Sequence, residues 1–368
     1  SPALAQVHEH GGGVAAEVPV SAAAYARGLY LLHNFEYDQA AAAFRAAQSA
    51  DPANVMAFWG EAMTYNHPLW AYQDREAARA VLARLGPDQA TRRAKARTPR
   101  EAMWLDAVEA LYGSGTKLER DRAYHERMRI LFEADRNDID ARSLYALATL
   151  GLAHEGRDTG LYMRSAALLE EALPTHPEHP GLLHYMIHSY DDPAHAPLGE
   201  RAAARYAKVA PDAGHAQHMI SHIYLALGRW AEVESANVIA DGVVDAQRRA
   251  SGKPPANCGH YNDWLIYALD QQGKDSSARI ETCRADAMAA AARSDGTVLG
   301  DVRDAFNGWA TMAVRHGVDT GQWPDWSVVK PETGSASGRF DLAYGRLLTA
   351  RRDGSAASAA LAEMKLLA

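Results

Sequence analysis

The chain has 368 residues, of which 48% are apolar and 23% are charged, so it has ample material for a large buried core. Its 38 basic and 46 acidic residues leave a net charge of −8, and the most basic run, residues 91–100, is short, so we expect no nucleic-acid partner. No apolar run approaches the roughly 20 residues that a membrane helix needs, and we expect no membrane partner.

The first residues, SPALAQVHEHGGG, are rich in glycine and alanine and carry His8 and His10. We predict that residues 1–20 form a flexible N-terminal arm. The tripeptide at residues 3–5, Ala-Leu-Ala, resembles the small-residue end of a secretory signal. We therefore expect a periplasmic or secreted protein, with the cytoplasm as the alternative.

From residue 21 the sequence shows the pattern of a tetratricopeptide repeat (TPR), a pair of antiparallel helices. Gly28, Ala40, Phe44 and Pro52 stand at the spacings of that repeat. The two small residues let the helices approach, Phe44 fills the gap between them, and Pro52 ends the second helix. The segment WGEAM at residues 59–63 lies in the first helix of a second hairpin of the same kind.

Further helices follow at about 74–85, 99–112, 118–134, 141–153 and 160–173. Later hairpins are marked by Pro177 and Pro211 before their first helices and by glycines at their turns: Gly228, Gly273 and Gly317. A last hairpin covers about 338–366, and no segment is a convincing strand. The sequence predicts an all-α, TPR-like α-solenoid, a right-handed superhelix of about eight antiparallel hairpins that forms a single domain over residues 21–368.

Histidines are concentrated in three of these first helices. His184 and His188 are four residues apart, and His215, His218 and His222 follow with steps of three and four, so each set shares one helix face. In TPR arrays the second, fifth and ninth places of each first helix face the concave groove. The repeat register puts these five histidines on such places and adds His260, Asp263 and Tyr267 from the next helix.

Six neighbouring imidazoles are typical of a metal site, because a metal ion binds the neutral ring and replaces its missing hydrogen-bond partner. We predict one or two transition-metal ions, copper, zinc or iron, bound by the six groove histidines. A histidine-lined pocket without metal and hydrogen-bonded packing remain alternatives. Tyr185, Tyr267 and Asp263 are the candidate catalytic side chains, and Asp191, Asp192 and Asp263 can be ligands or can orient a ligand. Seven other histidines are interpreted as surface or hydrogen-bonded core residues: His33, His67, His125, His154, His179, His195 and His316.

The two cysteines fall at neighbouring ends of one predicted hairpin. Cys258 opens its first helix and Cys283 lies near the end of its second. A disulfide, which would favour an oxidising compartment, and two buried free thiols are both compatible with this placement.

The segments HYMIHSYDDP, PDAGHAQHMISHIYLALGRW and HYNDWLIYAL resemble a widespread group of bacterial TPR-containing proteins with H-Y-x-I-H, G-H-x-x-H-M-x-x-H-I-Y and H-Y-N motifs. The resemblance covers about residues 20–290 and implies the TPR-like fold and a shared groove site at the six histidines. It implies no particular reaction. We therefore keep two hypotheses: a metal-dependent enzyme, oxidative or hydrolytic, acting on a small molecule in the groove, and a peptide-binding scaffold without catalysis. The sequence does not indicate the oligomeric state.

Overall fold

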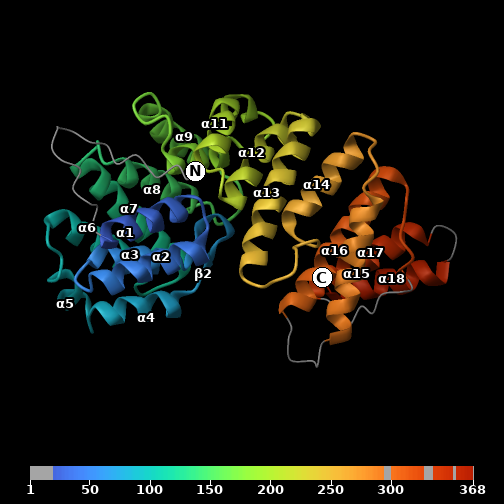
Figure 1. Cartoon of the computed structure of the whole chain (residues 1–368), viewed down its shortest axis with the longest axis horizontal. Coiled ribbons are helices and arrows are strands. Elements are labelled where there is room, and N and C mark those ends of the chain that lie inside the picture. The colour runs from blue at the N-terminus through green and yellow to red at the C-terminus, as the bar shows by residue number, and fades with distance from the viewer. Residues whose placement is uncertain (1–19, 294–299, 327–334, 351–353, 368) are drawn as a thin grey trace. The chain divides into compact units, whose positions relative to one another are not determined.

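The computed structural model describes residues 20–293, 300–326, 335–350 and 354–367, in which almost all regular structure is helical (Figure 1). The flexible arm predicted for residues 1–20 lies outside the described residues except for Val20, which begins α1. Residue contacts divide the chain into two compact units. The first contains residues 20–32 and 36–131, and the second contains residues 33–35 and the chain from 132 onward. The single domain predicted for residues 21–368 stays a prediction.

The first unit is built from antiparallel helices and one short hairpin. Its elements are α1 (Val20–His33, whose last residue belongs to the second unit), α2 (Tyr37–Ala50), α3 (Val55–Met63), β1 (Asn66–His67), the 3-10 helix η1 (Pro68–Trp70), β2 (Tyr72–Gln73), α4 (Arg75–Leu85), α5 (Gln89–Arg93), α6 (Pro99–Leu111) and most of α7 (Lys117–Ala134). Phe44 is fully buried, and a Cβ at Gly28 would come within 2.7 Å of its ring, which confirms the predicted close packing of α1 and α2. The expectation of no strand was wrong here, because β1 and β2 pair as a two-residue antiparallel ladder.

The second unit contains the remaining helices, and each packs against its neighbour in sequence. Its elements are α8 (Ile139–Leu150), α9 (Thr159–Ala172), α10 (Pro180–Tyr190), α11 (Ala196–Val209), α12 (Gly214–Ala226), α13 (Trp230–Ala250), α14 (His260–Gln271), α15 (Ser277–Arg293), α16 (Gly300–Thr320), α17 (Ala336–Thr349) and α18 (Gly354–Leu367). In addition α10 packs against both α8 and α12, and α14 packs against α16. Contacts between alternate helices are what stacked hairpins produce, so the fold is consistent with an α-solenoid.

Local sequence explains where several helices of the second unit begin and end. Pro180 stands at the first turn of α10, where its missing N–H costs nothing, and the His179 side chain accepts the Leu182 N–H as the N-cap. Gly228 and Gly273 have φ values of +69° and +67° at the ends of α12 and α14, as their predicted turn positions require. The turn predicted at Gly317 was wrong: this glycine lies inside α16 against Trp323, where a Cβ would collide, and Gly321 makes the turn instead.

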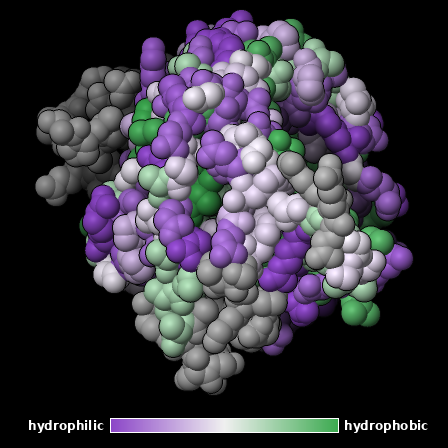
Figure 2. All heavy atoms as spheres, turned by 90° about the vertical axis from the view of Figure 1, so that its right-hand side faces the viewer, coloured by the Kyte–Doolittle hydropathy of each residue, from purple (hydrophilic) through white to green (hydrophobic). Residues whose placement is uncertain are grey.

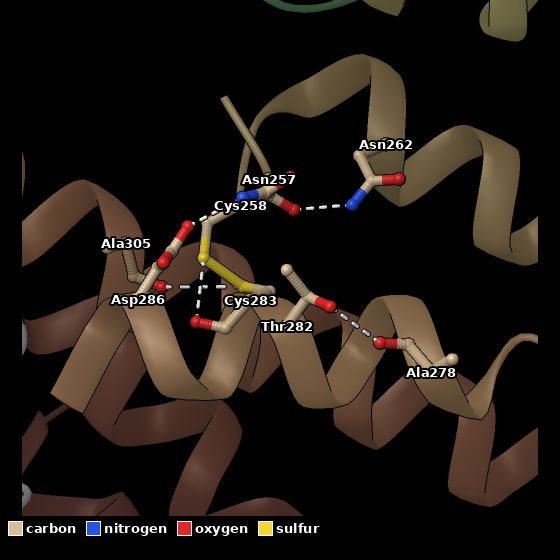
Figure 3. The surroundings of a disulfide bond; sticks show 8 residues. All are labelled: Asn257, Cys258, Asn262, Ala278, Thr282, Cys283, Asp286 and Ala305. Atoms are coloured by element: carbon tan, nitrogen blue, oxygen red, sulfur yellow. Dashed lines mark hydrogen bonds between the residues drawn. A yellow bond between two sulfur atoms is a disulfide. The ribbon is translucent and has the colours of Figure 1, made fainter. Parts of the chain in front are cut away.

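The cysteines form a disulfide, which decides between the two alternatives that the sequence left open (Figure 3). Cys258 precedes α14 and Cys283 lies on α15, with their Cα atoms 4.9 Å apart. Beside the bond, Asn257 Nδ2 donates to Asp286 Oδ2 at 2.7 Å. The link closes the hairpin whose first residue is His260 and therefore holds the start of α14 in place.

Polar side chains cover most of the described surface on the face shown in Figure 2, where apolar side chains form small separate patches. Among the described helices, none combines the length and the apolar character that crossing a membrane requires.

Candidate metal centre

The second unit brings the six predicted histidines into two groups of three. In the first triad, His184 and His188 of α10 meet His215 of α12, with Nε2–Nε2 distances of 3.1 Å (His184 to His188) and 3.2 Å (His184 to His215). In the second triad, His218 and His222 of α12 meet His260 of α14, and both Nε2 contacts of His218 measure 3.1 Å. Within each triad the three candidate ligand atoms lie within 4.8 Å of one another, so each triad can hold a metal ion.

The two triads are built in the same way on alternate helices: α10, α12 and α14. Each takes a pair of histidines four residues apart from one of these helices and a third histidine from the first turn of the next one, two helices later in the chain. The pairs are 34 residues apart, from position 184 to 218 and from 188 to 222, which is the length of a TPR unit. The second triad therefore repeats the first one hairpin later.

Hydrogen bonds to α13 and to the end of α10 fix the protons of the second triad. The Asn237 amide donates to the Val233 carbonyl at 2.8 Å, which turns its oxygen toward His218 Nδ1 at 2.7 Å. His218 therefore carries its proton on Nδ1 and a lone pair on Nε2. His222 Nδ1 likewise donates to Asp191 Oδ2 at 2.7 Å, which leaves a lone pair on His222 Nε2 when the ring is neutral. These two lone pairs face each other at 3.1 Å, a contact that a bound cation would convert from repulsion to attraction.

In the first triad, two ring nitrogens compete for one lone pair, which a hydrogen bond to the end of α1 places on His184 Nε2. His184 Nδ1 donates to the His33 backbone carbonyl at 2.6 Å, so its Nε2 carries a lone pair. The Nε2 atoms of His188 and His215 both approach that nitrogen. A single lone pair accepts one N–H, so both contacts cannot be good hydrogen bonds while the rings are neutral.

One aromatic side chain touches all three rings of each triad. The ring centroid of Phe35 is 4.4 Å from that of His184, 5.8 Å from His188 and 5.5 Å from His215. Trp264 stands 4.7, 4.4 and 5.7 Å from the rings of the second triad: His218, His222 and His260 respectively. Phe35 also has a φ of +57°, a costly conformation for a bulky residue that is typical of functional sites.

Burial keeps five of the six imidazoles neutral. Desolvation lowers the pKa of His184 to about 3 and that of His260 to about 4. For His188, His215 and His218, burial and then the neighbouring histidines hold the pKa well below its usual value. At neutral pH these rings are in the form that binds metal ions.

A third group with metal-like spacing was missed by the sequence analysis. His33 Nε2 and His179 Nε2 lie 2.9 and 3.0 Å from the same oxygen, Asp140 Oδ1. The sequence analysis placed both histidines among surface or core residues because nothing in the sequence links the end of α1 to α8 and α10. The one available signal was Asp140 itself, which stands on the second place of its helix, as His215 and His260 do.

The protons of this third group are arranged for hydrogen bonding. His179 Nδ1 accepts the Leu182 N–H at 3.3 Å, so its own proton is on Nε2 and is donated to Asp140. His33 donates to the same carboxylate, and its Nδ1 accepts the Tyr185 hydroxyl at 3.0 Å. Burial alone would raise the pKa of Asp140, but the two histidine hydrogen bonds hold it well below its usual value. The donors and acceptors in these contacts are matched without a metal ion.

The polar groups of the candidate catalytic side chains contact residues outside the two triads, although the Tyr185 ring centroid lies 5.3 Å from that of His184. The Tyr185 hydroxyl bonds to His33, and the Tyr267 ring contacts Trp230 and the Arg315 guanidinium. Asp263 Oδ2 accepts from Arg315 Nη1 at 3.1 Å. Of the three carboxylates proposed to be ligands or to orient one, Asp191 accepts a hydrogen bond from His222 of the second triad, whereas Asp192 pairs with Arg157 and His195.

No protein-family model matches the sequence, and no curated protein matches it. The functional conclusion therefore rests on the chemistry of the two triads.

Proposed function

We propose that this protein is a metal-dependent enzyme whose two histidine triads each bind one transition-metal ion. The observation that carries the proposal is the pair of lone pairs on His218 Nε2 and His222 Nε2, 3.1 Å apart and fixed by Asn237 and Asp191. Imidazole nitrogen suits zinc, copper and iron.

Three nitrogen ligands per ion favour catalysis over a purely structural role. Structural zinc sites use four protein ligands, whereas catalytic sites keep a position for water or substrate. An ion in either triad would polarise a small substrate or activate water or dioxygen at that position. The chain's own contribution is to fix the protons of His184, His218 and His222 and to shield one side of each triad with Phe35 or Trp264.

Two further features of the proposal concern the setting of the site. The 34-residue spacing of the histidine pairs supports a TPR-like superhelix, in line with the resemblance to bacterial TPR-containing proteins. The Cys258–Cys283 disulfide supports a periplasmic or secreted location, because structural disulfides persist in oxidising compartments.

Elemental analysis of protein purified without a histidine tag tests the proposal. We expect copper, zinc or iron at one to two equivalents per chain, and loss of that metal in the double variant His184→Ala, His218→Ala. The control is His125→Ala, His195→Ala, which removes the same number of imidazoles outside the triads and should keep the metal. A native protein that neither contains nor takes up these metals would favour the peptide-binding scaffold instead.

A further inference from the structure

We propose that the two triads form one coupled two-metal centre: a divalent ion on either triad weakens the binding of a divalent ion on the other, and the loaded pair favours an oxyanion as its substrate. This inference rests on the proposed function, because it assumes that each triad binds an ion. It follows from the distance between the triads and from the charge of their ligands.

The two triads meet on α12. His215 of the first triad and His218 of the second are three residues apart on this helix, and their ring centroids are 6.5 Å apart. An ion bound to an imidazole nitrogen lies about 2 Å from that atom, so ions on these two rings would be about 13 Å apart at most. The pKa of His215 is lowered first by burial and then by histidines of both triads, including His222. A charge on one triad therefore acts on the rings of the other.

The ligands do not offset the charge of the ions, because imidazoles bind metal as neutral rings. Two divalent ions about 13 Å apart repel each other enough to weaken binding of the second ion about tenfold, even with the dielectric constant of water. A shorter distance or partial burial makes the effect larger. We therefore expect the two ions to bind with negative cooperativity.

The fixed charges near the triads set the affinity of each site but not the coupling between them. Asp191 bonds to His222 and Arg315 acts on His260, both in the second triad, and Arg157 donates to two backbone carbonyls of α10. These groups are present whether the neighbouring triad is empty or loaded. Their effects, and those of every other partner of a ligand ring, cancel when the two states are compared.

The same charges indicate the class of substrate. Two divalent ions on neutral rings keep their full charge, and Asp191 offsets only part of it. The ion pairs Arg157–Asp192 and Arg315–Asp263 add no net charge. An oxyanion near both ions reduces their repulsion, so it binds better to the doubly loaded protein and, by linkage, strengthens binding of the second ion. We therefore expect the substrate to carry a carboxylate or another oxyanion.

Zinc titration of the demetallated, folded full-length chain against a competing chelator measures the coupling at low ionic strength, where screening is weak. His184→Ala, His188→Ala leaves only the second triad intact, and His218→Ala, His222→Ala leaves only the first. The two variants are matched, since each removes the histidine pair of one helix. We expect the overall wild-type constant for two ions to be at least about tenfold smaller than the product of the two single-site constants. The comparison holds for any pair of single-site affinities, and equal values would overturn the coupling.

Two single variants supply the same constants by a different deletion. His215→Ala removes the third histidine of the first triad, and His260→Ala removes that of the second. The affinity of the triad left intact should match the value from the corresponding double variant, with far-UV circular dichroism as the check that each chain is folded. A coupling found with one set of variants and absent with the other would also overturn the proposal.

Acetate tests the substrate class. The titrations are repeated in sodium acetate and in sodium perchlorate at the same ionic strength, so that screening is equal and only acetate binds the metal well. Competition of acetate for free zinc affects the wild-type constant and the product of single-site constants equally and cancels. We expect the coupling to be weaker in acetate than in perchlorate.

The outcomes separate the levels of the proposal. Wild type that binds no zinc overturns the metal-binding function itself. Two ions that bind without coupling overturn the coupled centre and leave metal binding intact. A coupling of the same size in acetate and perchlorate overturns the oxyanion and leaves the coupling intact.

Discussion

The second triad and the group of His33, His179 and Asp140 have the same spacing of candidate ligand atoms but opposite proton arrangements. In the triad, the lone pairs of His218 and His222 meet. In the other group, two N–H bonds converge on one carboxylate oxygen. Distance alone would mark both as metal sites. The hydrogen bonds on the far nitrogens distinguish the two: a bound cation would suit the facing lone pairs of the triad, whereas the donors and acceptors of the other group are already matched.

The equivalent positions on α14 carry no histidine pair, so the series of proposed metal sites ends there. One repeat after His218 and His222, the inward places carry Asp263 and Tyr267. There Arg315 donates to Asp263 at 3.1 Å and lies 4.9 Å from the Tyr267 ring centroid. Arg315 thus supplies a cation to these positions of α14, whereas the corresponding positions of α10 and α12 carry histidines. We infer that Asp263 and Tyr267 close the array of sites and do not extend it.

The largest expected effect contrasts the two kinds of histidine group directly. His218→Ala, His222→Ala should remove at least half of the bound metal, because it deletes two of three ligands of one site. His33→Ala, His179→Ala should keep the full amount, since the His33 carbonyl that orients His184 belongs to the backbone. Elemental analysis gives the metal content per folded chain of each variant. Equal losses in both variants would contradict the inference that the second triad binds metal and the Asp140 group does not.

Removing the metal should lower stability only when the triads are intact. A ligand at 100 times its Kd stabilises the folded state by about 2.7 kcal/mol, so a chelator should lower the Tm of the wild type by several degrees. The midpoint of His184→Ala, His218→Ala should not respond to the chelator. Thermal unfolding followed by circular dichroism measures both. A chelator response that persists in the variant would place the bound metal elsewhere.

Much of the triads could be predicted from the sequence because helical periodicity alone places His184 with His188 and His218 with His222 on one face. The repeat register added His260. The grouping of six histidines into two sets of three depends on how α10, α12 and α14 pack, which no local pattern contains.

Other parts of the site depend on residues far away in the chain. His33 and Phe35 reach the first triad from the end of α1, about 150 positions before His184, and Phe35 does so through an unusual backbone conformation. Asn237 comes from the second helix of a hairpin, a place that the groove register ignores. The proton positions follow from these contacts and were therefore not predictable.

The Asp140 hydrogen bonds should contribute stability that depends on pH and not on metal. Asp140→Asn removes the charge that accepts both imidazole N–H groups, and we expect a loss of about 1–3 kcal/mol near neutral pH, because the carboxylate is partly exposed. The folded-state pKa of Asp140 is lowered, so its contribution is complete above the unfolded value of about 4 and is lost as the pH falls further. Urea unfolding of both proteins at pH 7 and pH 3.5 should show that the difference in free energy of unfolding between wild type and Asp140→Asn is smaller in acid. A difference that stays constant would mean that the carboxylate charge is not its source.

Tyr185→Phe should have the smallest effect. It tests whether the Tyr185 hydroxyl serves as a structural hydrogen-bond donor to His33 or as part of the metal centre. Its hydroxyl donates to His33 Nδ1 at 3.0 Å in a fully buried position, so its removal leaves one acceptor without a donor and should cost about 1–2 kcal/mol. We expect the metal content and the zinc affinities of both triads to stay at wild-type values, because the hydroxyl is bonded to His33 of the Asp140 group and the phenyl ring beside His184 is kept. Urea unfolding and zinc titration of the same preparation measure the two quantities together. A loss of metal without a loss of stability would instead assign Tyr185 to the metal centre, and the Asp140 group would then have to be counted as part of that centre.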